Sequence, residues 1–155
     1  MIHKVLFICH GNICRSTMAE MVFKHLVRQA GMADMFYINS TATSREELGN
    51  GVHYGTRRKL AEVGIPCEDH RATLTTKADY DKYDHLIVMD TNNIRNLMRI
   101  IGSDPAHKVS MLLDYAGRQG ESIADPWYTG NFDITYDDVM EGCKGLLEYL
   151  TGYKA

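Results

Sequence analysis

The sequence lacks any apolar run long enough to cross a membrane. No stretch approaches the roughly 18 consecutive apolar residues that a membrane-spanning helix requires. The apolar run at residues 5–8 is also too short for the core of a secretory signal peptide, and no small-residue cleavage pattern follows it. We therefore expect a cytoplasmic protein that does not associate with membranes.

Cysteines are few, and net charge is small. The 4 cysteines do not form the Cys-x2-Cys pairs of structural zinc sites, so no metal site is expected. Structural disulfides are rare in the cytoplasm, and we expect Cys67 and Cys143 to be buried free thiols. The net charge of −3 gives no reason to expect binding to nucleic acid.

The chain also lacks repeats, low-complexity tracts and linkers rich in proline, glycine and serine. Its 155 residues are close to the usual size of one domain, and its apolar content of 45% is ordinary for a soluble globular protein. We therefore predict a single domain over residues 1–155.

Short apolar runs alternate with helical patterns, which is typical of a mostly parallel α/β sheet. The predicted strands are residues 5–8, 35–38, 85–89 and 109–113, and the predicted helices are about residues 19–30, 52–63, 94–101 and 136–150. This order predicts an α/β three-layer sandwich with a central four-stranded parallel sheet. In such folds ligands bind at the carboxyl ends of the strands.

The strongest chemical signal lies between the first strand and the first helix, in the segment Cys9-His10-Gly11-Asn12-Ile13-Cys14-Arg15-Ser16. Gly11 and Asn12 can take the positive φ angles of a tight loop, whose backbone N–H groups then converge on an anion at the helix N-terminus. That setting favours the thiolate of Cys9, which Ser16 can steady by a hydrogen bond. Arg15 can hold two phosphate oxygens, so the loop indicates covalent catalysis through a cysteinyl-phosphate.

A less specific interpretation makes Cys9 a buried thiol at the end of a strand and Arg15 a surface residue of the first helical turn. At the start of that helix, Thr17 and Glu20 fit a capping box.

Covalent catalysis on a phosphate ester also requires an acid for the leaving group, and Asp125 is the best candidate. Pro126 restricts Asp125 to extended geometry. Trp127 and Tyr128 would exclude water from its carboxyl group and favour the protonated form. An Asp-Pro pair alone is more often only a turn, so this prediction depends on the Cys9 loop.

Together the two motifs resemble the low-molecular-weight protein-tyrosine phosphatase family, over essentially the whole chain. Residues 40–43, 69–72 and 89–93 support the resemblance. It implies a flavodoxin-like fold of the phosphotyrosine phosphatase I type. It also implies a metal-independent hydrolysis of phosphotyrosine without cofactors, in which Cys9 attacks phosphorus, Arg15 binds its oxygens and Asp125 acts as acid and then as base.

The resemblance also implies which residues form and support the phosphate-binding loop: His10, Gly11, Asn12, Ile13, Cys14, Ser16, Ser40 and His70. Within this set, Asn12 would hold the loop in its strained shape with Ser40 and His70 behind it. Cys14 resembles a second loop cysteine that forms a reversible disulfide with the nucleophile in some members, and a simple packed thiol is the alternative.

The chain departs from the family at Glu46, where many members carry a tryptophan on the wall of the substrate cleft. Losing that aromatic ring removes a stacking surface, and acidic residues there disfavour strongly acidic phosphopeptides. Glu46, Trp127 and Tyr128 are the predicted wall residues, and His53 and Tyr54 are further candidates for an aromatic wall.

Three alternatives remain open. A thiol-dependent arsenate reductase shares the loop but needs further cysteines, and none lies between Cys67 and Cys143. A phosphoarginine phosphatase would resemble this chain except for a threonine where Ile13 stands. A phosphate-binding adaptor would not need both Cys9 and Asp125. The expected partners are phosphotyrosine-containing proteins or peptides and phosphate, bound by a monomer or weak dimer.

Overall fold

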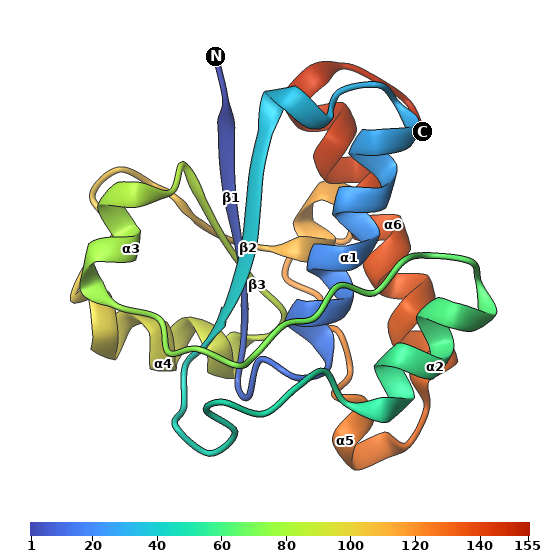
Figure 1. The fold of residues 1–155 in the computed structure, drawn as a ribbon. Helices are drawn as coiled ribbons and strands as arrows, with labels where there is room; N and C mark the ends of the chain where they lie inside the picture. Colours follow the sequence, from blue (N-terminus) through green and yellow to red (C-terminus); the bar gives the residue numbers. More distant parts are fainter.

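The computed structural model describes all 155 residues and is built on one four-stranded sheet (Figure 1). The strands are β1 (His3–Cys9), β2 (Phe36–Ala42), β3 (His85–Val88) and β4 (Val109–Met111). Their order in the sheet is β2-β1-β3-β4, and each neighbouring pair runs parallel. The predicted parallel α/β sheet is confirmed.

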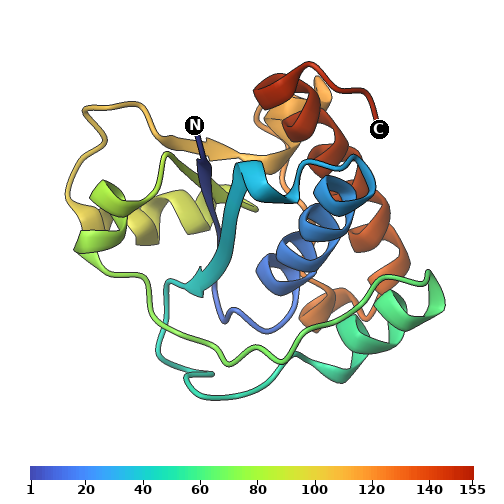
Figure 2. The same ribbon diagram turned by 45° about the horizontal axis from the view of Figure 1, so that its top comes forward.

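Helices cover both faces of this sheet, and Figure 2 shows the same layers from a second direction. The helices are α1 (Arg15–Gln29), α2 (Tyr54–Glu62), α3 (Lys77–Lys82), α4 (Thr91–Ile101), α5 (Pro126–Thr129) and α6 (Phe132–Thr151), with short 3₁₀ helices η1 (Ala33–Met35) and η2 (Leu112–Ala116). None of them combines the length and the apolar composition that spanning a membrane would require.

The central strand β1 shows why its sequence reads as one continuous apolar run. Val5 and Phe7 pack into the larger core cluster with α1 and α6, whereas Leu6 and Ile8 pack into a second cluster with α4. Successive side chains of a strand point to opposite faces, so a strand covered on both sides needs apolar residues throughout. This burial fixes the carboxyl end of β1, at Cys9, in the middle of the sheet.

Three local features differ from the sequence predictions. β2 continues to Ala42 through polar residues, because Ser40 and Thr41 are buried and hydrogen-bonded rather than solvated. Residues 112–113 belong to η2 and not to a strand. The helices α3 and α5 were not predicted, since six and four residues are too few to show an apolar period.

The carboxyl ends of the strands gather the segments that carry the predicted chemistry. The loop that follows Cys9 leads into α1, the loop that follows β2 passes beside it, and α5 lies at the same end of the molecule, at the bottom of Figure 1. Both chain termini lie at the opposite end of the sheet in this view.

Candidate active site

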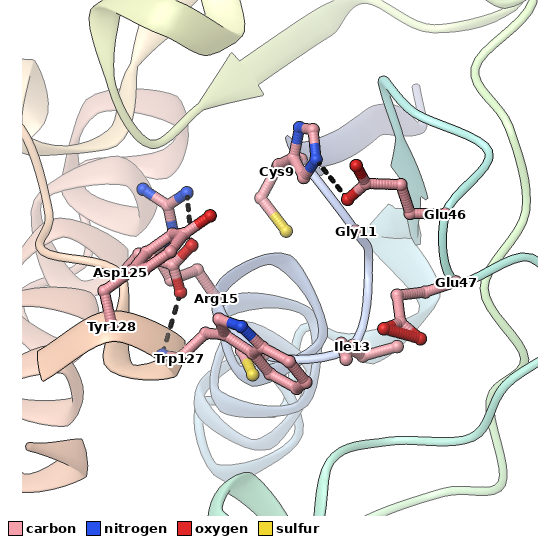
Figure 3. Close-up of a pocket in the computed structure, with 11 residues that line it drawn as sticks. Cys9, Gly11, Ile13, Arg15, Glu46, Glu47, Asp125, Trp127 and Tyr128 are labelled. Carbon is pink, nitrogen blue, oxygen red and sulfur yellow. Dashed lines mark hydrogen bonds and ion pairs between the residues drawn. The ribbon is translucent and has the colours of Figure 1, made fainter. Parts of the chain in front are cut away.

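A cavity of about 90 Å³ lies at the carboxyl end of β1 (Figure 3). Its lining comes from the loop after β1 (Cys9, His10, Gly11, Ile13, Cys14, Arg15), the loop after β2 (Glu46, Glu47) and the start of α5 (Asp125, Trp127, Tyr128). The structure thus brings the three predicted catalytic side chains to one cavity. In Figure 3 the Cys9 sulfur points into the space between the Asp125 side and the Glu46 side.

Cys9 has two hydrogen-bond partners at its sulfur. The residue is only 3% exposed, and its Sγ lies 3.0 Å from Ser16 Oγ and 3.3 Å from the backbone nitrogen of Asn12, which donates to it. The N-terminus of α1 begins six residues after Cys9, at Arg15, and its partial positive charge faces the loop.

Arg15 is held rigidly from behind. It is 3% exposed, and its Nη1 donates to Asp90 Oδ2 at 2.7 Å and to the carbonyl oxygen of Ile123 at 2.9 Å. Burial lowers the pKa of Arg15, but Cys9, Asp90 and Asp125 together outweigh it and raise the pKa above its usual value. The guanidinium therefore stays charged and fixed in the cavity wall. Sequence reasoning included Asp90 in a supporting segment without finding this ion pair.

Asp125 faces Arg15 from the other side of the cavity. Its Oδ2 lies 3.5 Å from Arg15 Nη2, and its Oδ1 accepts a hydrogen bond of 3.0 Å from the backbone N–H of Trp127, which caps α5. The Asp125 side chain is 23% exposed, whereas Trp127 and Tyr128 are 55% and 82% exposed. The Asp125 carboxyl group is therefore mostly removed from water, although the rings of Trp127 and Tyr128 are themselves largely exposed.

Asn12 holds the loop in an unusual backbone conformation. Its φ is 59° and its side chain is fully buried. Nδ2 donates to Ser16 Oγ at 2.8 Å and to Ser40 Oγ at 2.9 Å, while Oδ1 accepts a 2.7 Å hydrogen bond from His70 Nε2. The family resemblance implied that Ser40 and His70 lie behind Asn12, and the contact of Asn12 with Ser16 is an addition to that prediction.

Gly11 serves the loop differently from the prediction, because its φ is not positive. A Cβ at this position would lie 3.3 Å from Glu47 Cγ. The glycine therefore allows the neighbouring loop to approach closely, and Asn12 alone supplies the positive φ between β1 and α1.

Glu20 is a member of this network that sequence reasoning assigned to another role. It is 2% exposed, accepts a 2.5 Å hydrogen bond from Ser40 Oγ and pairs with Lys24 Nζ at 2.6 Å. The predicted capping box is wrong, since Thr17 Oγ1 donates to the carbonyl oxygen of Cys14 and Glu20 points into the interior. Burial lowers the pKa of His70, whose Nδ1 lies 3.5 Å from Glu20 Oε1.

We expect replacement of Asn12 to destabilise the whole protein. Asn12→Gly removes buried hydrogen bonds and should lower the free energy of unfolding by about 2 kcal/mol. Asn12→Ala should cost about 1 kcal/mol more, because alanine is disfavoured at positive φ. Urea unfolding followed by circular dichroism measures both values. Equal stability of the two variants would show that backbone strain at this position is absent.

The other cysteines occupy different environments. Burial raises the pKa of the Cys14 thiol to about 12, and nearby Cys9 adds to the rise, so Cys14 is a neutral thiol in the same cavity. Cys143 is fully buried, as expected, but Cys67 is only half-buried, because it lies in the loop after α2 rather than on a packed helix face. All four cysteines are free, and no three His, Cys, Asp or Glu side chains are grouped to hold a metal ion.

The rim opposite α5 is acidic. Glu46 Oε2 lies 2.8 Å from His10 Nε2, and Glu47 accepts a 2.6 Å hydrogen bond from Asn50. Glu46, Trp127 and Tyr128 all line the cavity, whereas His53 and Tyr54 line a neighbouring groove. The cavity wall therefore has a His–Glu pair on one side and aromatic rings on the other.

Comparison with known proteins gives one consistent result. The family model described as "Low molecular weight phosphotyrosine protein phosphatase" matches residues 4–154. A low molecular weight protein-tyrosine-phosphatase of Bacillus subtilis, YfkJ, is 35% identical over 92% of both chains, and a mouse low molecular weight phosphotyrosine protein phosphatase is 36% identical over 93% of both.

Solved structures agree. The match to the crystal structure of YfkJ spans 100% of this chain and 98% of the YfkJ chain, with a TM-score of 0.93 and 33% sequence identity. The match to a Drosophila arginine phosphatase spans 96% of this chain and 98% of the Drosophila chain, with a TM-score of 0.85 and 28% sequence identity. The same fold therefore carries more than one phosphatase specificity.

Proposed function

Because the chain belongs to the low molecular weight phosphotyrosine protein phosphatase family, we propose that Cys9, Arg15 and Asp125 carry out its hydrolysis of phosphotyrosine. The observation that supports these roles best is the geometry of the cavity. A buried sulfur with two hydrogen-bond partners, a guanidinium held by two acceptors and the carboxyl group that caps α5 all line one cavity. These are the groups that nucleophilic attack, charge stabilisation and proton transfer require.

In the first step the phosphoryl group binds against Arg15 and the loop amides. The Cys9 thiolate attacks phosphorus, an S–P bond forms, and the bond from phosphorus to the phenolic oxygen breaks. Asp125 gives its proton to the departing phenolate.

In the second step Asp125, now a carboxylate, takes a proton from a water molecule. The water oxygen attacks phosphorus, the S–P bond breaks, and the electron pair returns to Cys9 as a thiolate. Inorganic phosphate is released, and Ser16 stabilises the returning charge by its hydrogen bond to the sulfur. No cofactor takes part in this proposal.

The role of Asp125 is tested by Asp125→Asn, which keeps the size and the capping oxygen of the side chain. We expect kcat/KM for phenyl phosphate to fall by about 10²-fold, because the poor phenolate leaving group needs a proton. The fall for p-nitrophenyl phosphate should be clearly smaller, since nitrophenolate leaves without one. Asp34→Asn, an exposed change in η1, is the matched control. An equal fall for both esters would contradict the role as general acid.

Substrate class is tested by offering phosphotyrosine, phosphoserine and phosphoarginine to the same enzyme. We propose phosphotyrosine-containing proteins or peptides as substrates, and the apolar Ile13 in the cavity lining supports an aromatic substrate. Faster turnover of phosphoarginine would assign this chain to the specificity named for the Drosophila structure. We further propose that residues 1–155 act as one cytoplasmic domain, a monomer or weak dimer that binds neither nucleic acid nor membrane.

A further inference from the structure

A second and larger hollow adjoins the catalytic cavity. It measures about 800 Å³ and lies between α2, α5 and the first turn of α6. Trp127 lines both spaces, so the two hollows adjoin at this side chain. We refer to it as the α2–α5 groove.

The α2–α5 groove is lined by aromatic rings that are already packed together. The His53 ring lies 5.0 Å from that of Tyr54 and 5.5 Å from those of Phe132 and Trp127. Tyr54 and Trp127 are nevertheless 64% and 55% exposed. Aromatic side chains that are exposed and held in place lose little entropy on binding, and they are enriched where proteins bind partners.

The groove also carries one positive side chain that makes no ion pair, although its four charged residues sum to zero. Lys59 is paired with Asp133 at 2.8 Å and with Glu62 at 3.5 Å, so it already has two anionic partners, and the three side chains together carry a charge of −1. Arg58 lies on the same wall, is exposed and makes no ion pair. Across the catalytic cavity the rim has the opposite sign, because Glu47 bonds only the neutral amide of Asn50.

The size of the catalytic cavity determines what must lie outside it. The phosphoryl group must reach Cys9 and Arg15 inside this small cavity, so the polypeptide that carries the phosphotyrosine lies outside it. That polypeptide must cross the rim on both sides of its phosphotyrosine. One side of the rim presents Glu46 and Glu47, and the other leads to Tyr54, Trp127 and Arg58.

We propose that the α2–α5 groove binds the substrate segment flanking the phosphotyrosine, with an apolar side chain on Tyr54 and Trp127 and a carboxylate on Arg58. The proposal rests on the proposed function. The opposite rim determines in which orientation the peptide binds, since Glu46 and Glu47 repel an acidic flank and attract a basic one. The enzyme thereby selects phosphotyrosine with an acidic residue on one side only.

The test uses phosphotyrosine peptides in an alanine background, with one glutamate moved through the four positions on each side. For each peptide kcat/KM is divided by the value for phenyl phosphate, which has no flanks. We expect glutamate on one side to raise this ratio by about three- to fivefold, the discrimination that one exposed ion pair supports. Arg58→Glu should abolish this gain and give lysine the advantage at the same position. Tyr54→Ala should lower the ratio for all peptides.

The matched control is Arg57→Glu. Arg57 is the neighbouring exposed residue of α2, but it lines a different hollow beside Cys67. The two variants change net charge equally, so only a local effect distinguishes them. If both variants shift the ratios alike, or if the native enzyme shows no preference between flanks, the groove proposal is overturned. If the native enzyme hydrolyses neither phenyl phosphate nor any peptide, the proposed function itself fails.

Discussion

We expect Cys9→Ser to abolish phosphotyrosine hydrolysis, lowering kcat by on the order of 10⁴-fold or more. The hydroxyl of serine ionises far less readily than a thiol, so the donors around Cys9 Sγ cannot produce a comparable nucleophile. Steady-state kinetics with phenyl phosphate and a phosphotyrosine peptide measure the loss. Mass spectrometry of acid-quenched enzyme should detect a phosphorylated intermediate in the native protein and none on the variant.

The control is Cys14→Ser, in the same loop and cavity. Burial raises the pKa of Cys14 to about 12, so this thiol supplies no thiolate near neutral pH. The control should therefore keep at least about a tenth of native activity, and the Cys9 variant should still bind inorganic phosphate in calorimetry. Retention of more than about 1% of kcat by Cys9→Ser would refute the role of Cys9 as nucleophile.

The second large effect is expected for Arg15→Lys, which should lower kcat/KM by about 10³-fold although the positive charge is kept. A lysine ammonium cannot present two parallel N–H donors to phosphate oxygens, and it cannot satisfy Asp90, the Ile123 carbonyl and a ligand together. Asp90 then loses the hydrogen bond that Arg15 Nη1 donates to it in the cavity wall. Kinetics with phenyl phosphate and calorimetry with inorganic phosphate should both register the change.

Arg28→Lys is the appropriate comparison for this variant. Arg28 lies on the exposed last turn of the same helix, where it reaches Glu68 at 3.8 Å. Its replacement should leave kinetics and phosphate binding at native values. An Arg15→Lys enzyme that loses no more than about tenfold would show that charge alone, without the planar geometry, is sufficient for catalysis.

The fold could be predicted from the sequence where burial is uniform. The apolar run of β1 identifies a strand covered on both faces, and α6 shows its stripe clearly. Prediction was incomplete where polar residues are buried. Ser40 and Thr41 continue β2 because Glu20 and Thr75 bond their hydroxyl groups, and those partners are distant in sequence.

In the active site, too, features of short segments could be predicted and contacts between distant segments could not. Cys9, Arg15 and Asp125 could be chosen because their chemistry and spacing are informative within short segments. The ion pair from Arg15 to Asp90 and the contacts of Glu20 could not be derived, since each depends on elements far apart in the chain. The exposure of Trp127 and Tyr128 was also not predictable, because a residue's type does not determine which way a four-residue helix turns it.

The placement of residues 1 and 155 at the end of the sheet remote from the catalytic cavity has a practical consequence (Figure 1). An affinity tag, a fluorescent protein or a targeting module joined at either terminus would extend away from the cavity mouth and the α2–α5 groove. The same geometry allows the enzyme to be attached to a sensor surface by one end with its substrate-binding side directed into solution. Attachment chemistry and enzymology can therefore be designed independently of each other.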